Sequence, residues 1–262
     1  MTTHAASLVD WSPDAVVFDC DGTLMDTERH WQDARNRALH AFGLAPSPGF
    51  AQRAKGVHYT DCGRLMAEEA HKPELTAALT KALLEHFLEL VADDPVTMPG
   101  AAEFVRSLSG RLPLAVASNC PLEVVEECLL RAGLRQYFQH IVVPSGVRPQ
   151  VPDGIAVAPG RAVVRPKPWP DVYATAARLC GASPHRTLAV EDSLTGVESA
   201  WRAGLRVLGV GPQPDGAHSG RADLWVPALH SPLLTAWVRE RVPYPAGAQD
   251  RIGGQRRSRR SG

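Results

Sequence analysis

The sequence has little of what marks a secreted, membrane-bound or nucleic-acid-binding protein. Its 262 residues include only five cysteines, an odd number without metal-type spacing, which argues against a disulfide scaffold. The 28 Lys and Arg residues balance 28 Asp and Glu residues, so no net charge attracts nucleic acid or a membrane surface. No apolar run approaches membrane-spanning length, and residues 1–13 lack the basic and apolar regions of a secretion signal. We therefore expect a cytoplasmic protein with no nucleic-acid or membrane partner, and we take a monomer as the default.

Short apolar runs alternate with amphipathic stretches over most of the chain. The runs read as buried strands, and the stretches between them have the three- and four-residue apolar spacing of helices. Such alternation predicts a parallel sheet covered on both faces, the doubly wound (Rossmann-like) α/β fold, whose ligands bind beyond the carboxyl ends of the strands. The expected strands are 15–18, 112–117, 141–143, 187–190, 207–210 and 224–226, and the expected helices between them are 101–109, 121–131, 171–180 and 196–203.

One block departs from this alternation. Residues 28–44, 60–70 and 73–91 all read as helices, and nothing among them resembles a strand. We therefore expect a core made of residues 14–26 plus 97–240, interrupted by an all-helical domain at residues 27–96. Residues 145–164 contain an expected hairpin around Pro159-Gly160, which we interpret as a surface insertion, with a flap beside the site as the alternative. The Gly-, Ser- and Arg-rich end, residues 241–262, is expected to be a disordered basic tail.

The strand at 15–18 leads into two acids, in the string Asp19-Cys20-Asp21-Gly22-Thr23. If strand geometry continues through Cys20, both carboxylates point to the same side. Two crowded acids are unfavourable unless a cation or a proton lies between them. A turn whose acids cap the next helix is the simplest alternative. A calcium loop is disfavoured because Gly22 directly follows the second acid.

Three further polar motifs follow in order. Ser118-Asn119 comes directly after the expected strand at 112–117, and Glu191-Asp192 after the strand at 187–190. Lys167 lies between them within Pro-Lys-Pro-x-Pro-Asp-x-Tyr, where prolines on both sides restrict its direction. Because carboxyl ends of parallel strands share one edge of the sheet, Asp19, Ser118 and Asp192 are expected to converge on a single site.

Together these four motifs resemble those of the haloacid dehalogenase superfamily, whose members are mostly phosphatases. The helical block resembles the small C1 cap of its subfamily I, which closes over the site. The resemblance extends from about residue 16 to residue 210. It implies a Mg²⁺-dependent phosphomonoester hydrolase that acts on a small phosphorylated metabolite through an aspartyl-phosphate intermediate.

The resemblance also implies a role for each matching residue. Asp19 would be the nucleophile and Asp21 the general acid and base, with Lys167 and Ser118 stabilising the transferred group. The phosphate- or substrate-binding set would be Gly22, Thr23, Ser118, Asn119, Lys167 and, from the cap string Lys55-Gly56-Val57-His58, Lys55. The Mg²⁺ set would be the Asp19 side chain, the Asp21 carbonyl, Asp192 and Glu191, the last either as a ligand or by orienting Lys167 or a metal-bound water. A solvated loop lysine is the alternative for Lys55.

Several other functions share parts of this pattern. A dehalogenase would lack the second acid, so Asp21 argues against that activity. A phosphomutase similar to β-phosphoglucomutase has all four motifs, but Tyr59 lies near the position where such a cap carries an arginine. A phosphonate-cleaving relative would use a cap lysine, for which Lys55 is the candidate. A non-catalytic binding or regulatory protein is the remaining alternative, and the retention of Asp19 and Asp21 argues against it. The sequence does not identify the phosphorylated substrate.

Overall fold

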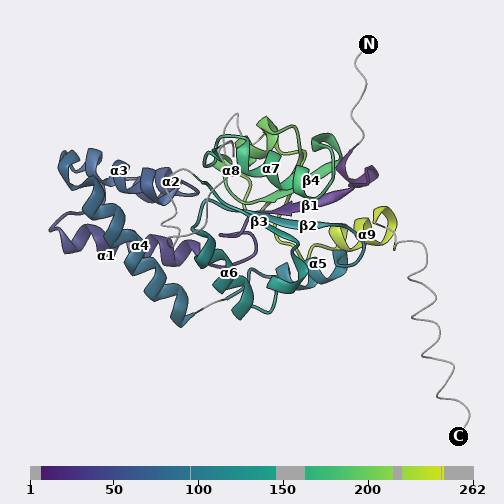
Figure 1. Cartoon of the computed structure of the whole chain (residues 1–262), viewed down its shortest axis with the longest axis horizontal. Helices are drawn as coiled ribbons and strands as arrows, with labels where there is room; N and C mark the ends of the chain where they lie inside the picture. The colour runs from purple at the N-terminus through teal and green to yellow at the C-terminus, as the bar shows by residue number, and fades with distance from the viewer. Residues whose placement is uncertain (1–6, 95, 146–162, 215–219, 243, 245–262) are drawn as a thin grey trace, which may run out of the picture.

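The core of the protein is a six-stranded parallel sheet (Figure 1). A computed structural model describes residues 7–94, 96–145, 163–214, 220–242 and 244. The strands run in the order β3-β2-β1-β4-β5-β6, so the chain order reverses beside β1, where open α/β sheets bind ligands. The doubly wound prediction is confirmed. The strand bounds are β1 Ala15–Phe18, β2 Leu114–Ala117, β3 His140–Val142, β4 Thr187–Glu191, β5 Arg206–Val210 and β6 Leu224–Val226.

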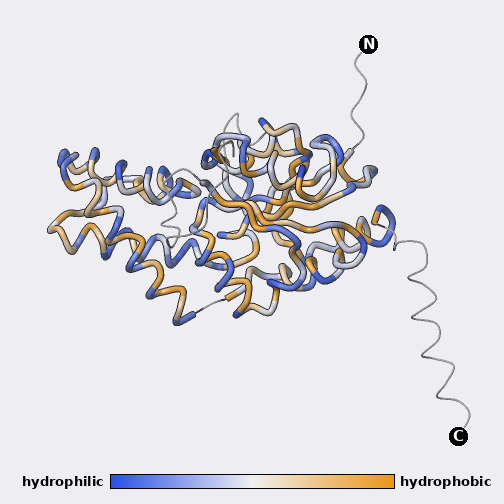
Figure 2. Tube along the Cα trace, in the orientation of Figure 1, coloured by the Kyte–Doolittle hydropathy of each residue, from blue (hydrophilic) through white to orange (hydrophobic). Residues whose placement is uncertain are grey.

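Helices cover both faces of the sheet. Helices α5 (Ala101–Leu108), α6 (Leu122–Arg131) and α9 (Pro232–Arg241) lie on one face, and α7 (Asp171–Leu179) and α8 (Leu194–Arg202) lie on the other (Figure 1). Successive strand side chains point to opposite faces, so Val16 and Phe18 pack in the first layer while Val17 packs in the second. Figure 2 shows the strands as a hydrophobic band between the helices. A strand buried on both faces needs apolar residues at every position, as β1 and β2 have.

A separate helical block lies beyond one end of the sheet (Figure 1). It consists of α1 (Glu28–Ala41), α2 (Phe50–Ala54), α3 (Tyr59–Glu69) and α4 (Thr76–Asp93), and no strand occurs among its described residues. Its helices pack through rings such as Trp31 and Phe87, which stack with centroids 3.6 Å apart. The two chain segments that connect this block to the sheet are hydrogen-bonded to each other. The Asp26 amide donates to the Val96 carbonyl, and the Met98 amide donates to the Leu24 carbonyl. The assignment of residues 27–96 as a domain stays a prediction.

Some elements were not expected from the sequence. Helix α2 has only five residues after Gly49, too few for an apolar period, and α9 lies in a stretch with weak amphipathic character. The expected helix at 73–91 divides into a 3-10 turn, Pro73–Leu75, and α4. The expected hairpin around Pro159-Gly160 and nearly all of the expected tail lie outside the described residues.

Two features of the chain's chemistry also follow from the structure. No helix within the described ranges has both the length and the apolar character needed to cross a membrane. All five cysteines are free thiols in this structure.

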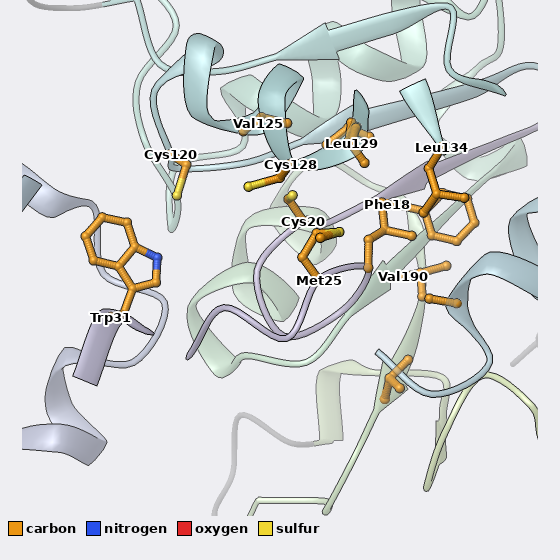
Figure 3. Packing of buried hydrophobic residues seen from close by; sticks show 14 of the residues in the cluster. Phe18, Cys20, Met25, Trp31, Cys120, Val125, Cys128, Leu129, Leu134 and Val190 are labelled. Carbon is orange, nitrogen blue, oxygen red and sulfur yellow. The ribbon is translucent and has the colours of Figure 1, made fainter. Parts of the chain in front are cut away.

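The ring of Phe18 joins the sheet to the helix layer below it. It makes edge-to-face contacts with Phe104 and Phe138 at centroid distances of 6.0 and 5.9 Å. Leu134 and Val190 lie close to this ring (Figure 3). Phe18 is completely buried and directly precedes Asp19, so this packing fixes the strand end from which the site begins.

We expect Phe18→Ala to lower the free energy of unfolding by about 3–5 kcal/mol, because it removes a buried ring and leaves a cavity. Urea unfolding followed by circular dichroism measures this loss. Leu130→Ala, at a side chain that is 65% exposed, is the control and should change stability by less than about 0.5 kcal/mol. A Phe18→Ala loss below about 1 kcal/mol would contradict the packing described.

Candidate active site

The predicted site residues meet at the carboxyl edge of the sheet. Asp19 follows β1, Ser118 follows β2, and Glu191 ends β4 with Asp192 after it. Lys167 enters from the segment before α7, and its ammonium lies 2.5 Å from Asp19 Oδ1 and 2.6 Å from Glu191 Oε1. The structure therefore brings together residues that are up to 173 positions apart.

Glu191 is held by donors on both of its oxygens. Oε1 accepts from Lys167 Nζ and, at 2.9 Å, from the Tyr173 hydroxyl. Oε2 accepts from the backbone amides of Asp192 and Ser193 and from the Ser193 hydroxyl, all within 3.1 Å. Glu191 is completely buried, and a buried carboxylate is stable only with such partners. This network fixes the direction in which the Lys167 ammonium points.

Asp21 has a different environment from Asp19. Its Oδ1 accepts from the Thr27 hydroxyl at 2.5 Å and from Trp31 Nε1 at 3.3 Å. Its Oδ2 accepts from Ser118 Oγ at 3.3 Å and from Cys120 Sγ at 2.9 Å. The two acids of the first motif thus have separate partners: Asp19 faces an ammonium, and Asp21 faces neutral donors from both the sheet and α1.

Gly22 and Thr23 complete the turn after Asp21. Gly22 has φ +82°, and a Cβ there would lie 2.4 Å from Asp192 Oδ2. Glycine is required both for the left-handed turn and for this close approach. The Thr23 hydroxyl is buried without a hydrogen-bond partner in the described part of the chain.

Asn119 and Lys55 link the site to the helical block. Asn119 Oδ1 accepts from the Lys167 amide at 2.8 Å, and its Nδ2 donates at 3.3 Å to the carbonyls of Lys167 and Gly56. Lys55 Nζ lies 2.8 Å from Asp192 Oδ2. Asn119 therefore braces Lys167, and the loop after α2 rests on the sheet with the Lys55 ammonium in the site.

The site has an excess of buried negative charge. The carboxylates of Asp19, Glu191 and Asp192 offer oxygens within 4.8 Å of one another, and the Asp21 carboxylate lies outside this group. Burial and the neighbouring acids raise the pKa of the Asp19 carboxyl well above its ordinary value, although Lys167 opposes this. Burial disfavours the charged form of Lys167, but Asp19 and Glu191 raise its pKa and keep it protonated. Clustered hard oxygen ligands with too little positive charge fit a divalent cation.

A cavity opens from this cluster toward the helical block. It encloses about 550 Å³, part of it open to solvent. Asp19, Asp21 and Lys167 line the sheet side, and residues of α1 and the loop after α2 line the opposite side. Figure 3 shows Trp31 of α1 facing Cys120. A small molecule in the cavity would have its reacting end at Asp19 and its remainder against the helical block.

Comparison with known proteins identifies the family. The family model for haloacid dehalogenase-like hydrolases matches residues 13–204. The chain belongs to this family of hydrolases. That match confirms the resemblance given by the four motifs, and the expectation of a phosphatase-type enzyme is confirmed by the names of its relatives.

Relatives of this haloacid dehalogenase-like hydrolase carry phosphatase names. The chain is 30% identical over 202 residues to the phosphorylated carbohydrates phosphatase of Thermotoga maritima, covering 75% of this chain and 85% of the relative. It is 25% identical over 195 residues to the fructose-1-phosphate phosphatase of Escherichia coli, covering 74% and 95%. Among solved structures, a mutant of the CbbY protein of Rhodobacter sphaeroides in complex with xylulose 1,5-bisphosphate has a TM-score of 0.63 and 26% identity, covering 83% and 95%.

Several residues around the site were not singled out from the sequence. Thr27, Trp31 and Cys120 hold Asp21, and Tyr173 holds Glu191. Of these four residues, only Tyr173 could have been found from the sequence, because it belongs to the Pro-Lys-Pro-x-Pro-Asp-x-Tyr motif around Lys167. A single threonine or tryptophan at the start of a helix is indistinguishable in sequence from a capping or core residue.

We expect Asp192→Asn to stabilise the metal-free hydrolase by about 1–3 kcal/mol at about pH 7.5. Burial raises the pKa of the Asp192 carboxyl from 3.8 to about 6, although Lys55 opposes this. The folded wild type therefore holds that proton more tightly than the unfolded chain, and loses stability as pH rises from about 4 to about 6. The gain from Asp192→Asn should be small near pH 4 and complete above about pH 6.5.

Urea unfolding in EDTA across this pH range measures the difference. The exposed Asp33→Asn on α1 is the matched control and should show no such dependence. Added Mg²⁺ should stabilise the wild type and not Asp192→Asn. Equal stabilities of wild type and Asp192→Asn at every pH would contradict the excess of buried negative charge described for the site.

Proposed function

We propose that this hydrolase removes phosphate from a small phosphorylated metabolite, with Mg²⁺ as cofactor and an aspartyl-phosphate on Asp19 as intermediate. The observation that carries the proposal is the separation of the two acids. Asp19 lies among Lys167, Glu191 and Asp192, whereas Asp21 lies apart among neutral hydrogen-bond donors. This separation supports a role in attack for Asp19 and a role in proton transfer for Asp21. The names of the relatives support a phosphorylated sugar or a related compound as substrate.

The donor set fits a hard divalent cation. The Asp19 side chain, the Asp21 carbonyl and Asp192 would hold it, and it would supply positive charge against the phosphoryl oxygens. Glu191 already accepts from Lys167, Tyr173 and the Ser193 segment, which favours an orienting role for it.

The protein's own groups account for the two steps. In the first, an Asp19 oxygen attacks phosphorus, the ester bond breaks, and Asp21 gives its proton to the leaving oxygen. In the second, Asp21 takes a proton from a water molecule whose oxygen attacks phosphorus, and inorganic phosphate leaves Asp19. Lys167 and the Ser118 hydroxyl offset the charge on the phosphoryl oxygens in both steps.

The helical block would act as the cap. Lys55 and Gly56 contact the sheet loops, so the block closes the cavity from the side opposite Asp19. Excluding bulk water strengthens the electrostatic contacts around the phosphoryl group. Cytoplasmic location and a monomeric state stay predictions.

We expect Asp19→Asn to lower kcat for phosphate release by at least about 10³-fold, because the amide is a poor nucleophile. A malachite-green assay with phosphorylated sugars, with and without Mg²⁺, measures this. The exposed Asp33→Asn should keep wild-type rates. Wild-type activity in Asp19→Asn would exclude the covalent mechanism, and wild-type activity that persists in EDTA would exclude the metal requirement.

We expect Asp21→Asn to separate the two steps. With p-nitrophenyl phosphate the leaving group needs no proton, so the first step should persist while the second slows for lack of a base. Stopped-flow absorbance should then show a burst of about one p-nitrophenol per enzyme before slow turnover. Loss of the burst together with turnover would show that Asp21 is not specific to proton transfer.

A further inference from the structure

Helix α1 presents two charged side chains to the cavity. Glu28 and Arg35 are seven residues apart, so two helical turns place them on one face. Arg35 Nη2 lies 2.7 Å from Glu28 Oε1, and the Arg35 side chain is only 4% exposed. Neither residue belongs to the four sequence motifs, and the reaction at Asp19 does not use them. They form the wall against which the non-reacting part of a substrate would lie.

One oxygen of the Glu28 carboxylate is available to a ligand. Glu28 Oε1 accepts from Arg35, but Oε2 has no hydrogen-bond partner among the residues that the structure describes. Burial raises the pKa of the Glu28 carboxyl, while Arg35 and, less strongly, Lys55 oppose this. Glu28 lines the cavity, and a partly buried carboxylate oxygen without a partner gains most from a donor group on a ligand, such as a hydroxyl.

The positive charges along the cavity already have partners. Arg35 is neutralised by Glu28, and Lys55 lies at the reacting end on Asp192. Lys167 lies between Asp19 and Glu191. Among the described residues that line the cavity, no other Lys or Arg occurs, and Tyr59 offers only a phenol. A second anionic group on the substrate would lie beside the Glu28 carboxylate and would meet only cations that already have an acidic partner, which like-charge repulsion disfavours.

We propose that Glu28, held by Arg35, selects substrates whose leaving group is uncharged and rich in hydroxyls. Glu28 Oε2 accepts a hydrogen bond from a substrate hydroxyl, and its charge disfavours bisphosphates and phosphorylated carboxylic acids. The inference rests on the proposed phosphatase function and names the substrate class: phosphate monoesters of neutral sugars or polyols. Specificity of this kind combines an attractive contact with the preferred substrate and a repulsive contact with its competitors. Glu28 supplies both, because it attracts a hydroxyl and repels a second anionic group.

Matched substrates test this directly. Fructose 1-phosphate and fructose 1,6-bisphosphate differ by one phosphate, and phosphoglycolate carries a carboxylate in place of hydroxyls. We expect the wild type to show a kcat/KM at least about tenfold higher for fructose 1-phosphate than for either other compound, since a hydrogen bond to a charged group has about this effect. A wild-type preference for fructose 1,6-bisphosphate or phosphoglycolate would overturn the proposal.

Glu28→Gln tests the residue. It removes the charge, leaves Arg35 uncompensated and preserves the side-chain shape. We expect kcat/KM to fall about tenfold for fructose 1-phosphate and to rise several-fold for fructose 1,6-bisphosphate. Adding Arg35→Gln to Glu28→Gln should abolish that rise. Opposite changes for two substrates cannot come from partial unfolding, whereas an equal change for all three would mean that Glu28 only braces α1.

Two controls complete the design. Asp33→Asn, on the exposed side of the same helix, should leave all three kcat/KM values unchanged. Thermal unfolding establishes that each variant is folded at the assay temperature, and if Glu28→Gln is not, the wild-type preferences alone decide. Wild-type hydrolysis of p-nitrophenyl phosphate distinguishes a failure of the proposed phosphatase function from a failure of the Glu28 assignment. Its absence, together with inactivity on all three compounds, contradicts the proposed function, whereas its presence with the wrong preference contradicts only the Glu28 assignment.

Discussion

A single ammonium group lies between two buried carboxylates, and the remainder of the site follows from the negative charge that this contact leaves. Lys167 contacts Asp19 and Glu191, both almost fully buried, while the Asp192 carboxylate lies next to them and pairs with the cap lysine, Lys55. Buried carboxylates without enough positive charge bind either protons or cations. The proposed metal site, the proposed role of Asp19 as nucleophile and the contact of the Lys55 loop with Asp192 are therefore different consequences of one electrostatic constraint.

The same constraint explains why the site lies beside β1. The chain order of the sheet reverses between β1 and β4, so the segments that leave these two strands diverge and open a crevice. Asp192 can lie against the turn that follows Asp19 because Gly22, in that turn, has no side chain to collide with the Asp192 carboxylate. Phe18, the residue before Asp19, is held by the rings of Phe104 and Phe138, which lie in the helix layer against one face of the sheet. Apolar packing thus places the charged cluster, and the charged cluster could not form from local sequence alone.

The sequence predicts the features that have a period or a motif, and it misses those that depend on distant partners. The β1 strand and the Lys167 string are visible because alternation, proline placement and residue order are local properties. Helix α2 was not predicted because five residues are too few to show a period. Trp31 lies within the expected helix at 28–44, and no local pattern there shows that its indole N–H reaches Asp21. The position of Lys55 was open between solvent and site, and only the folded arrangement places it on Asp192.

The contacts of Asp21 connect the position of the cap to the chemistry proposed here. Two of its donors, Thr27 and Trp31, belong to the start of the helical block, and the other two, Ser118 and Cys120, belong to the segment that follows β2. Any movement of α1 away from the sheet would remove donors from one oxygen of Asp21 and leave the other unchanged. The position of the helical block therefore determines how many donors hold the Asp21 carboxylate, and the geometry proposed for proton transfer depends on contact between the block and the core.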